Sequence, residues 1–571
     1  MRGFIRAAAC ARYLRPWLIA AVALPAVAAA AAAAQSTATT ESPPELGEVI
    51  VTAQHIHSTE SRTPVAMDVI SGATLSKQNL ITVADLNGYA QNLNVQENYS
   101  GVQLTIRGVT NTNSSTLDDP AVAFMLDGIY IPRQTTLMYL GFYDINRIEV
   151  LRGPQGTLWG RNTTGGVVNV ITNPPDPSEV HYSGSASAGN YGATNDQLMI
   201  NLPVTSNFAL RAAVDYDRRN TYLNKTPGDP YSLDPAQGDF SGRLSALWKI
   251  NDDVTLNVET DYANEDNVFF DWVPTTNFYH SPTTADPYYN YENSIYYDAG
   301  ASAQLDMNGF RQYWQGGTSA HTWGISPRLD WDMGPLKMTY LGAYRAQDEH
   351  YRYGFPVTLT YAMPNLYISS DEDNSQELRF ATRGDGPLQV QFGLYYFREV
   401  LHDNWSLSDF PEILDYGYIG VGSEPQTNTS KAAFAQATYK ITPALHVTAG
   451  LRESHDQKDY FSETVRNYFE PYSDPAVNFS TPSFADIGYS KLTWRGGVTY
   501  DLSKGTMLYG TVSTGYKAGG VNDVGCLEGT SRNGILCTVI SLLPASVLFY
   551  KPETLNSYEA GIKSRLAADT M

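Results

Sequence analysis

The chain has 571 residues, a formal net charge of -21 and 39 tyrosines, while Asp, Glu, Lys and Arg together make up only 17% of it. Because 59 acidic residues stand against 38 basic ones and no basic stripe is present, a nucleic-acid-binding function is excluded. The aromatic content of 12% excludes an intrinsically disordered chain.

The first 34 residues have the pattern of a secretory signal peptide. Several arginines, the last at Arg15, precede an alanine-rich apolar run from Trp17 to Ala34. A membrane helix of this length is the alternative, but alanine is weakly hydrophobic and no cationic stop-transfer cluster follows. We therefore expect cleavage near Ala34 and export from the cytoplasm.

Residues 35–63 are predicted to be a flexible tether that carries a short apolar segment. Thr, Ser, Pro and Glu dominate the stretch from Gln35 to Leu46, and the apolar segment Gly47–Ala53 (GEVIVTA) follows it. An extended Val-Ile-Val segment on a tether can add as a strand to the sheet edge of a partner protein. The alternative is the first strand of the next domain, but Pro, Ser and Thr isolate the segment, which favours the partner role.

Residues 64–175 are predicted to form a small α+β domain. Thr82–Asp85 is typical of a helix start, and apolar residues at helical spacing extend the predicted helix to Leu93. Strands are expected at 102–106, 122–126 and 148–151. The glycines that crowd the end of the domain are interpreted as structural, because no Lys-Ser/Thr follows at the spacing of a phosphate loop: Gly153, Gly156, Gly160, Gly165 and Gly166.

A charged set stands out in this weakly charged domain: Arg107, Asp127, Arg147, Glu149 and Arg152. These side chains can pair with one another or with charges on a surrounding wall, and a buried pair is costly to break. Plain structural pairing and a gating role both remain open.

Residues 176–571 change to strands in which apolar and polar residues alternate. In 208–216, for example, Phe208, Val214 and other apolar residues share one face, while Arg211 and Asp215 lie on the other. Such strands, with aromatic residues near their ends, are typical of a membrane β-barrel with a wet interior. The alternative is a soluble β-sandwich.

Loop lengths favour the barrel over the sandwich. The turns at 249–253, 441–444 and 501–505 are short, whereas long polar insertions are expected at 264–318 and 403–430. One rim of tight turns and one rim of long loops is the asymmetry of a membrane barrel. About 14 strands can be counted in this region.

The cysteines predict a disulfide, and the sequence contains no recognisable catalytic motif. Cys526 and Cys537 enclose a loop rich in Gly, Ser and Asn, and a disulfide between them is expected in an oxidising compartment, with free thiols or a metal-binding pair as the alternatives. The sequence has no HExxH motif, no GxSxG motif and no paired-cysteine metal spacing. We therefore predict no enzyme activity, no cofactor and no metal site.

Several motifs, in order along the chain, resemble those of the TonB-dependent outer-membrane receptors: GEVIVTA at 47–53, IRG at 106–108, LDGIYI at 126–131, INRIEVLRGPQGTLWGRNTTGGVVNVIT at 145–172, SQELRF at 375–380, GYKAGG at 515–520 and PETLNSYEAGIK at 552–563. The resemblance implies an N-terminal plug inside a barrel of about 22 antiparallel strands in the bacterial outer membrane. It also implies transport powered by TonB with its ExbB/ExbD complex. The implied TonB box comprises Glu48, Val49, Ile50, Val51 and Thr52.

The resemblance assigns further residues of the plug a structural or gating role, among them Gly108 and Gly128 beside the charged set. It also places two plug segments near the outward-facing apex, and an aromatic barrel loop offers stacking surfaces. Loop packing is an equal alternative for the aromatic residues. The candidate ligand contacts are Asn111, Asn113, Asp118, Asp119, Arg133, Phe270, Trp272, Tyr288 and Tyr289.

The chain departs from the family pattern at its C-terminal end. The family barrel needs more strands than the 14 counted, and the PETLNSYEAGIK motif normally lies well before the end of the chain. We expect a C-terminally truncated receptor, because a half-open sheet would leave an unpaired edge in lipid. A naturally smaller barrel of 14 strands is the alternative.

The expected function is TonB-dependent import of a scarce ligand, most often a ferric siderophore in this family. A carbohydrate, a cobalamin-like molecule or an aromatic compound would use the same mechanism. A passive porin or adhesin is a function of another class, and the plug and the TonB box argue against it.

Overall fold

The computed structural model describes residues 50–56, 58–98, 101–111, 118–220, 237–268, 317–356, 362–384, 386–409, 418–468, 479–503, 505–521, 531–532, 535–536 and 549–564. Among these residues no helix is long and apolar enough to cross a membrane. Several predictions fall outside them: the signal peptide, Glu48, Val49, Asn113, Phe270, Trp272, Tyr288, Tyr289, Cys526 and Cys537.

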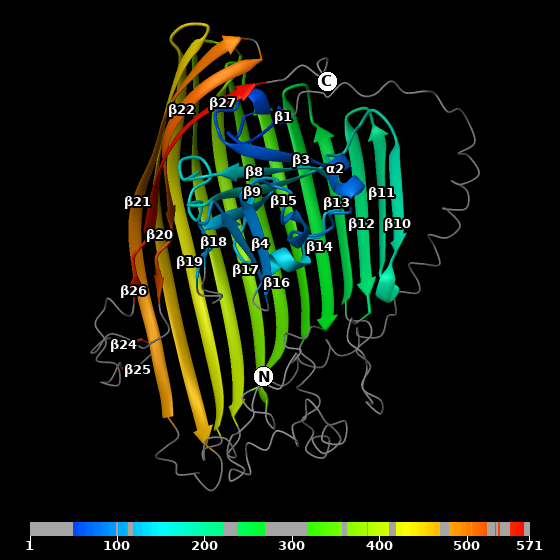
Figure 1. Ribbon diagram of the computed structural model, residues 1–571, viewed down its shortest axis with the longest axis vertical. Coiled ribbons are helices and arrows are strands. Elements are labelled where there is room, and N and C mark those ends of the chain that lie inside the picture. Colours follow the sequence, from blue (N-terminus) through cyan, green and yellow to red (C-terminus); the bar gives the residue numbers. More distant parts are fainter. Residues whose placement is uncertain are drawn as a thin grey trace, which may run out of the picture. The chain divides into compact units, whose positions relative to one another are not determined.

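Fourteen strands form one antiparallel sheet in which each strand pairs with its neighbour in the sheet order β10 to β22 and then β27 (Figure 1). The count of 14 strands made from the sequence is confirmed. The strands are β10 (His181–Ala188), β11 (Thr194–Thr205), β12 (Phe208–Arg219), β13 (Gln237–Lys249), β14 (Val254–Val268), β15 (Gly317–Asp332), β16 (Leu336–Pro356), β17 (Ala362–Thr382), β18 (Leu388–Asp409), β19 (Tyr418–Lys440), β20 (Leu445–Tyr468), β21 (Phe479–Ser503), β22 (Thr506–Lys517) and β27 (Glu553–Ser564).

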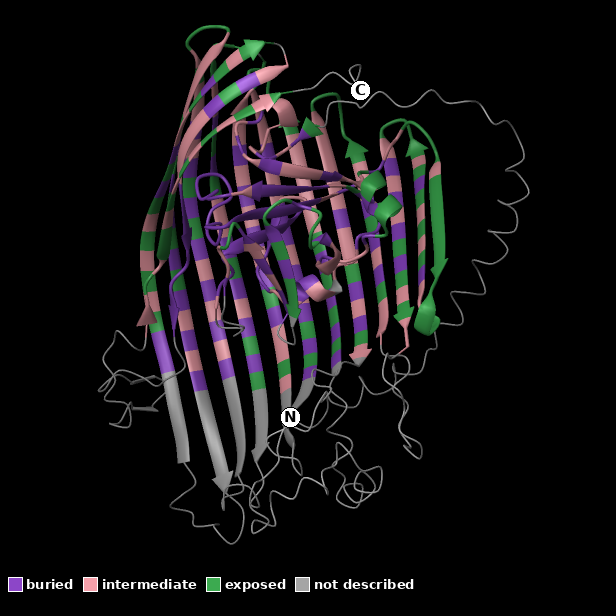
Figure 2. Cartoon of the chain, viewed as in Figure 1, coloured by how far each residue is buried: buried purple, intermediate pink, exposed green. Residues whose placement is uncertain are grey.

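The polarity of this sheet is inverted relative to a soluble protein. On β12 the buried face carries Arg211 and Asp215, whereas Val214 and Tyr216 are exposed. Figure 2 shows the same alternation of buried and exposed residues along many of the strands. Large apolar side chains remain exposed across the sheet, for example Leu394 at 61%. A soluble sandwich would bury these side chains, so the inversion favours the membrane barrel.

Strand lengths correct one prediction about the loops. The short connections near 250–253 and 441–444 lie where they were expected. The connection at 333–335, which was not predicted, is similarly tight. A long insertion at 403–430, however, is wrong, because β18 and β19 continue through most of it and Asp403 pairs with Glu424. Main-chain pairing does not require an apolar face, so polar residues extend these strands as a ladder. Residues 269–316 of the other predicted insertion lie outside the described part.

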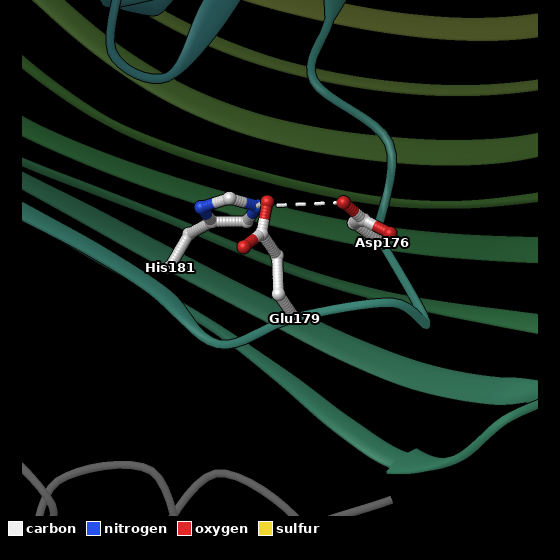
Figure 3. A group of neighbouring side chains, drawn as sticks. All are labelled: Asp176, Glu179 and His181. Atoms are coloured by element: carbon white, nitrogen blue, oxygen red, sulfur yellow. Dashed lines mark hydrogen bonds and ion pairs between the residues drawn. The ribbon is translucent and has the colours of Figure 1, made fainter.

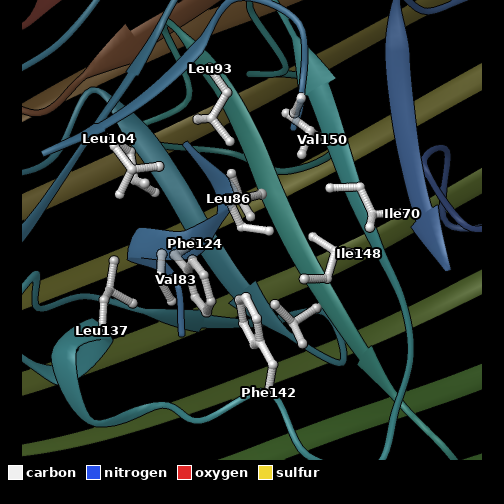
Figure 4. Packing of buried hydrophobic residues seen from close by; sticks show 14 of the residues in the cluster. Ile70, Val83, Leu86, Leu93, Leu104, Phe124, Leu137, Phe142, Ile148 and Val150 are labelled. Carbon is white, nitrogen blue, oxygen red and sulfur yellow. The ribbon is translucent and has the colours of Figure 1, made fainter. Parts of the chain in front are cut away.

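The N-terminal domain, called the plug below, contains a five-stranded sheet in the order β3-β8-β9-β6-β7. Strands β6 and β9 are parallel, and the other neighbours are antiparallel. Figure 4 shows the apolar core that packs against this sheet, with Leu86 and Phe124 at its centre. The sheet strands and the domain's hairpin and α-helices are β3 (Met67–Ser71), α2 (Gly72–Gln78), β4 (Leu93–Asn98), β5 (Gly101–Ile106), β6 (Val122–Leu126), β7 (Ile129–Ile131), α3 (Thr136–Tyr139), β8 (Ile145–Arg152) and β9 (Gly166–Thr172).

The three predicted plug strands are confirmed, but the predicted helix from Thr82 is wrong. Only a 3-10 turn, η3 (Ala84–Leu86), forms there, and Leu93 begins strand β4. The Asp85 carboxylate accepts the backbone N–H of Thr82 at 2.9 Å, as the capping pattern suggested. Gly88 (φ 83°) and Asn92 (φ 58°) then adopt left-handed conformations, which end any helix.

Two-residue turns place two of the predicted charged residues at hairpin tips. Asp127 (φ 51°) and Gly128 (φ 86°) link β6 to β7, and both have the positive φ that this turn type requires. Arg107 and Gly108 form an equivalent turn after β5. The remaining short elements are β1 (Ile50–Val51), β2 (Ser58–Thr59), η2 (Glu60–Arg62), η4 (Asn190–Gly192), β23 (Gly520–Val521), β24 (Ser531–Arg532), β25 (Ile535–Leu536) and β26 (Phe549–Tyr550).

Candidate functional site

Asp119 of the plug lies in a buried cluster of charges with the sheet. Its carboxylate is 2.6 Å from Lys458 Nζ of β20 and 3.6 Å from Arg161. Burial by itself would raise the pKa of the Asp119 carboxyl, but the charges of Lys458 and Arg161 hold it below its usual range. The carboxylate is therefore ionised in the folded protein and ties the plug to the sheet.

The other described candidate ligand residues also contact the sheet. Lys517 Nζ of β22 donates to Asn111 Oδ1 at 3.2 Å and to Asp118 Oδ2 at 3.1 Å. Arg133 Nε lies 2.7 Å from Glu399 of β18. The structure thus brings the four plug residues into polar contacts with neighbouring strands, and their contact with a ligand stays a prediction.

Asn162 makes several buried hydrogen bonds that were not predicted from the sequence. Its side chain is fully buried and donates to Asp119 Oδ1 at 2.9 Å and to the Tyr130 hydroxyl at 2.8 Å. Its Oδ1 accepts the backbone N–H of Ala518 at 3.1 Å. The neighbouring Arg161 guanidinium lies 4.8 Å from the Phe397 ring centroid. The only signal in the sequence is the position of both residues inside the longest plug motif.

The charged residues predicted from the sequence form ion pairs within the plug and also an ion pair with the sheet. Arg107 pairs with Glu559 of β27 at 3.0 Å, which links plug to sheet. Arg147 pairs with Glu149 at 2.8 Å, and Arg152 pairs with Asp68 at 3.3 Å, both inside the plug. Asp127 instead accepts the Thr172 hydroxyl at 2.8 Å. A gating role for any of these pairs stays a prediction.

Two of the glycines have a backbone conformation that disfavours a side chain, and at Gly166 the backbone also leaves no room for one. A Cβ at Gly160 (φ 86°) would lie 2.7 Å from the Arg452 guanidinium, and one at Gly166 (φ 149°) would lie 2.1 Å from the Leu151 carbonyl oxygen. Both positions have a positive φ, so a side chain at either would be strained. Their structural interpretation is thereby supported.

The C-terminal half of the apolar segment is packed against the plug and the sheet, where a flexible tether was expected. Val51 is fully buried, and β1 pairs with β2. The Thr52 N–H donates to Glu149 Oε1 at 2.8 Å, and the Trp159 indole N–H donates to the Ala53 carbonyl at 3.0 Å. Residues 50–56 are called the docked segment below.

Asp176 and Glu179, which lie between β9 and β10, gather with His181, the first residue of β10 (Figure 3). His181 Nε2 lies 3.3 Å from Asp176 and 3.5 Å from Glu179. Hydrogen bonds from Ser178 to Asp176 close a turn and lower the pKa of the Asp176 carboxyl. The turn accounts for the proximity of these partly exposed side chains.

Two regions of the chain match family descriptions. Residues 59–167 match the TonB-dependent Receptor Plug Domain, and residues 257–570 match the TonB dependent receptor-like, beta-barrel family. The chain is 24% identical over 524 residues to the pesticin receptor of Yersinia pestis, which covers 90% of this chain and 68% of that protein. It is 24% identical over 378 residues to the ferric aerobactin receptor of Klebsiella pneumoniae, covering 62% of this chain and 49% of that protein.

Solved structures of two receptors have a similar fold. The ferric yersiniabactin uptake receptor FyuA from Yersinia pestis superposes with a TM-score of 0.67 at 18% identity, over 88% of this chain and 70% of that chain. The closed form of the ferric-catecholate import receptor Fiu from E. coli superposes with a TM-score of 0.62 at 16% identity, over 89% of this chain and 72% of that chain. At these identities the likeness establishes the fold.

Proposed function

Because this chain belongs to the family of TonB-dependent receptors, we propose that it imports a ferric siderophore. It is a protein of the bacterial outer membrane. The energy for import comes from TonB, which we propose acts with ExbB and ExbD. The transport itself involves no enzymatic step.

The observation that carries this proposal is the position of the docked segment. It includes the last three residues of the proposed TonB box, Glu48–Thr52, and its main chain is bonded to Glu149 and Trp159 of the plug. A partner that adds to the box as a strand would therefore pull on the plug itself. A passive porin has no need for such a connection.

The ligand class rests on the names of several relatives. The aerobactin, yersiniabactin and catecholate receptors are all named for ferric chelates. A vitamin B12 transporter of Vibrio vulnificus is also similar, but over only 22% of its length. Chelates of iron are therefore the first ligands to test, and cobalamin-like, carbohydrate or aromatic ligands come second.

Uptake of ⁵⁵Fe tests the proposal in a host without its own ferric receptors. The panel contains catecholate, phenolate and citrate–hydroxamate chelates. One of them should be accumulated, and deletion of residues 49–51 should abolish accumulation while leaving surface binding intact. Deletion of residues 37–39 shortens the tether by the same length and should have little effect. Undiminished uptake after deletion of residues 49–51 would argue for passive diffusion.

A further inference from the structure

Beyond β1, which pairs with β2, the docked segment is held first by the plug and then by the sheet. In chain order, the Thr52 N–H donates to Glu149 of β8, and the Ala53 carbonyl accepts from Trp159. The Gln54 carbonyl then accepts from Gln391 Nε2 of β18 at 3.1 Å. The His55 ring follows and accepts a hydrogen bond from Arg379 of β17.

This order decides where a pulling force is applied. Tension that enters at the TonB box loads Thr52 and Ala53 before it reaches the two contacts with the sheet. The first two partners, Glu149 and Trp159, both belong to the plug. If the order were reversed, the membrane-embedded sheet would take the load and the plug would remain unstrained.

Trp159 also lies beside the residues that hold Asp119. Its indole is buried and its centroid lies 4.4 Å from that of the His55 ring. Two residues further along, Arg161 pairs with Asp119, and Asn162 donates to the same carboxylate. One short loop, residues 153–165, thus contacts the docked segment at one point and the Asp119 cluster at another.

Building on the proposed function, we propose that Trp159 is the positioning residue through which tension on the TonB box reaches the loop that holds Asp119. In the resting receptor the indole keeps the docked segment in place. Under tension the same hydrogen bond transmits force to Arg161 and Asn162. The bond therefore restrains TonB binding and supports transport at the same time.

Loss of the indole donor should consequently have two opposite effects. The docked segment should be released more easily, so that TonB binds the ligand-free receptor more tightly. Uptake should nevertheless fall, because the tension no longer enters the loop at Trp159. Simple destabilisation of the plug predicts neither this pairing nor its location.

Trp159→Phe in the full receptor is the test, because it keeps a ring and removes the N–H donor. A net hydrogen bond contributes about 1 kcal/mol, so hydrogen exchange at residues 52–54 should become roughly fivefold faster. Binding of the purified periplasmic domain of TonB to the ligand-free receptor should strengthen several-fold. Uptake of the ⁵⁵Fe chelate accepted in the uptake panel should fall several-fold, with surface binding unchanged.

Three control variants make the result specific. Trp494→Phe changes an exposed tryptophan on β21 and should alter none of the readouts. Leu86→Ala weakens the plug core away from the docked segment and should not strengthen TonB binding. Gln391→Ala removes the first contact with the sheet and should loosen Gln54 while preserving uptake.

Unchanged exchange and TonB affinity in Trp159→Phe would overturn the inference, as would an equal loss of uptake in Gln391→Ala. The same changes in Leu86→Ala would reduce Trp159 to a structural residue and overturn it as well. Failure of the proposed function looks different, because deletion of residues 49–51 would then leave uptake intact. If that deletion abolishes uptake and Trp159→Phe does not lower it, only the inference about Trp159 fails.

Discussion

The plug and the sheet are built from one chain but follow opposite rules of polarity. In the plug, apolar residues such as Leu86 and Phe124 are buried in a common core. In the sheet, apolar residues such as Leu394 and Leu492 are exposed, while charged residues including Arg452 and Asp456 are buried. The environment of each face, lipid or protein, decides which residues it carries.

This difference in polarity shows which side chains connect the plug with the sheet. The plug turns many polar residues toward the polar face of the sheet, where they form ion pairs and hydrogen bonds such as Lys458 with Asp119. A smaller apolar cluster, which includes Tyr130 of the plug and Phe397 of the sheet, lies beside these contacts. The polar contacts are replaceable by water or by a ligand's polar groups, whereas an apolar interface would resist separation. A plug that must move under tension is better served by a polar interface.

The largest expected effect comes from comparing the removal of a phenylalanine ring from the plug core with the removal of one from the sheet. Phe124→Ala removes a buried ring from the plug core and should destabilise the plug by about 4 kcal/mol. Phe392→Ala removes a ring that is 43% exposed on β18 and should leave plug stability unchanged. Hydrogen exchange of strands β6 and β9 measures both variants in detergent. Equal losses would mean that the plug does not have a core of its own.

Lys458→Met tests the polar interface between the regions. Removing one partner of a buried pair leaves Asp119 with Arg161 at 3.6 Å, and should cost about 3 kcal/mol. Exchange should accelerate at Asp119 itself and at Arg161 and Asn162, which contact this carboxylate. Lys431→Met, at an exposed lysine of β19, is the matched control. If both variants exchange alike, the pair does not hold the plug.

Leu394→Arg tests the outer face of the sheet. Leu394 is 61% exposed, and a cation on the lipid-facing side of a barrel costs about 2 kcal/mol, more near the midplane. Unfolding by urea in lipid vesicles should shift accordingly, whereas Leu394→Met should behave like the native protein. A neutral effect of arginine would indicate that this position lies outside the apolar layer.

The smallest expected effect is a pH dependence of the docked segment. Burial, followed by the charge of Arg379, lowers the pKa of His55 well below its ordinary value of 6.5. The released segment binds a proton near that ordinary value and the docked one does not, so docking is complete above about pH 6.5 and weakens as pH falls. Exchange at residues 52–56, corrected for its intrinsic rate, should rise between pH 7.5 and pH 5.5.

Substitution of His55 by glutamine removes the titrating group and provides the control. The variant should lose the pH-dependent part of the exchange rate. A rise of the same size in His55→Gln would assign the effect to other groups. The charges that face His55 come from Arg379, Arg452 and Arg328.

Sequence patterns predicted the strands of the large sheet better than the secondary structure of the plug. Alternation along each strand is a local pattern, so the inward position of Arg211 and the outward position of Val214 could be predicted from adjacent residues. The helix at Thr82 failed because its apolar spacing also suits a loop, and left-handed residues at Gly88 and Asn92 break it. The continuation of β18 and β19 past Asp403 failed because polar alternation carries no apolar signal.

The sequence by itself determined the family, the strand count and the residue types available at the plug. Only the tertiary structure decided their partners, because the contacts join residues that are far apart in the chain. Arg107 and Glu559 are 452 residues apart, and Trp159 and Ala53 are 106 apart. No local pattern specifies such pairs, since they form when a plug folded from one segment meets a sheet formed by another.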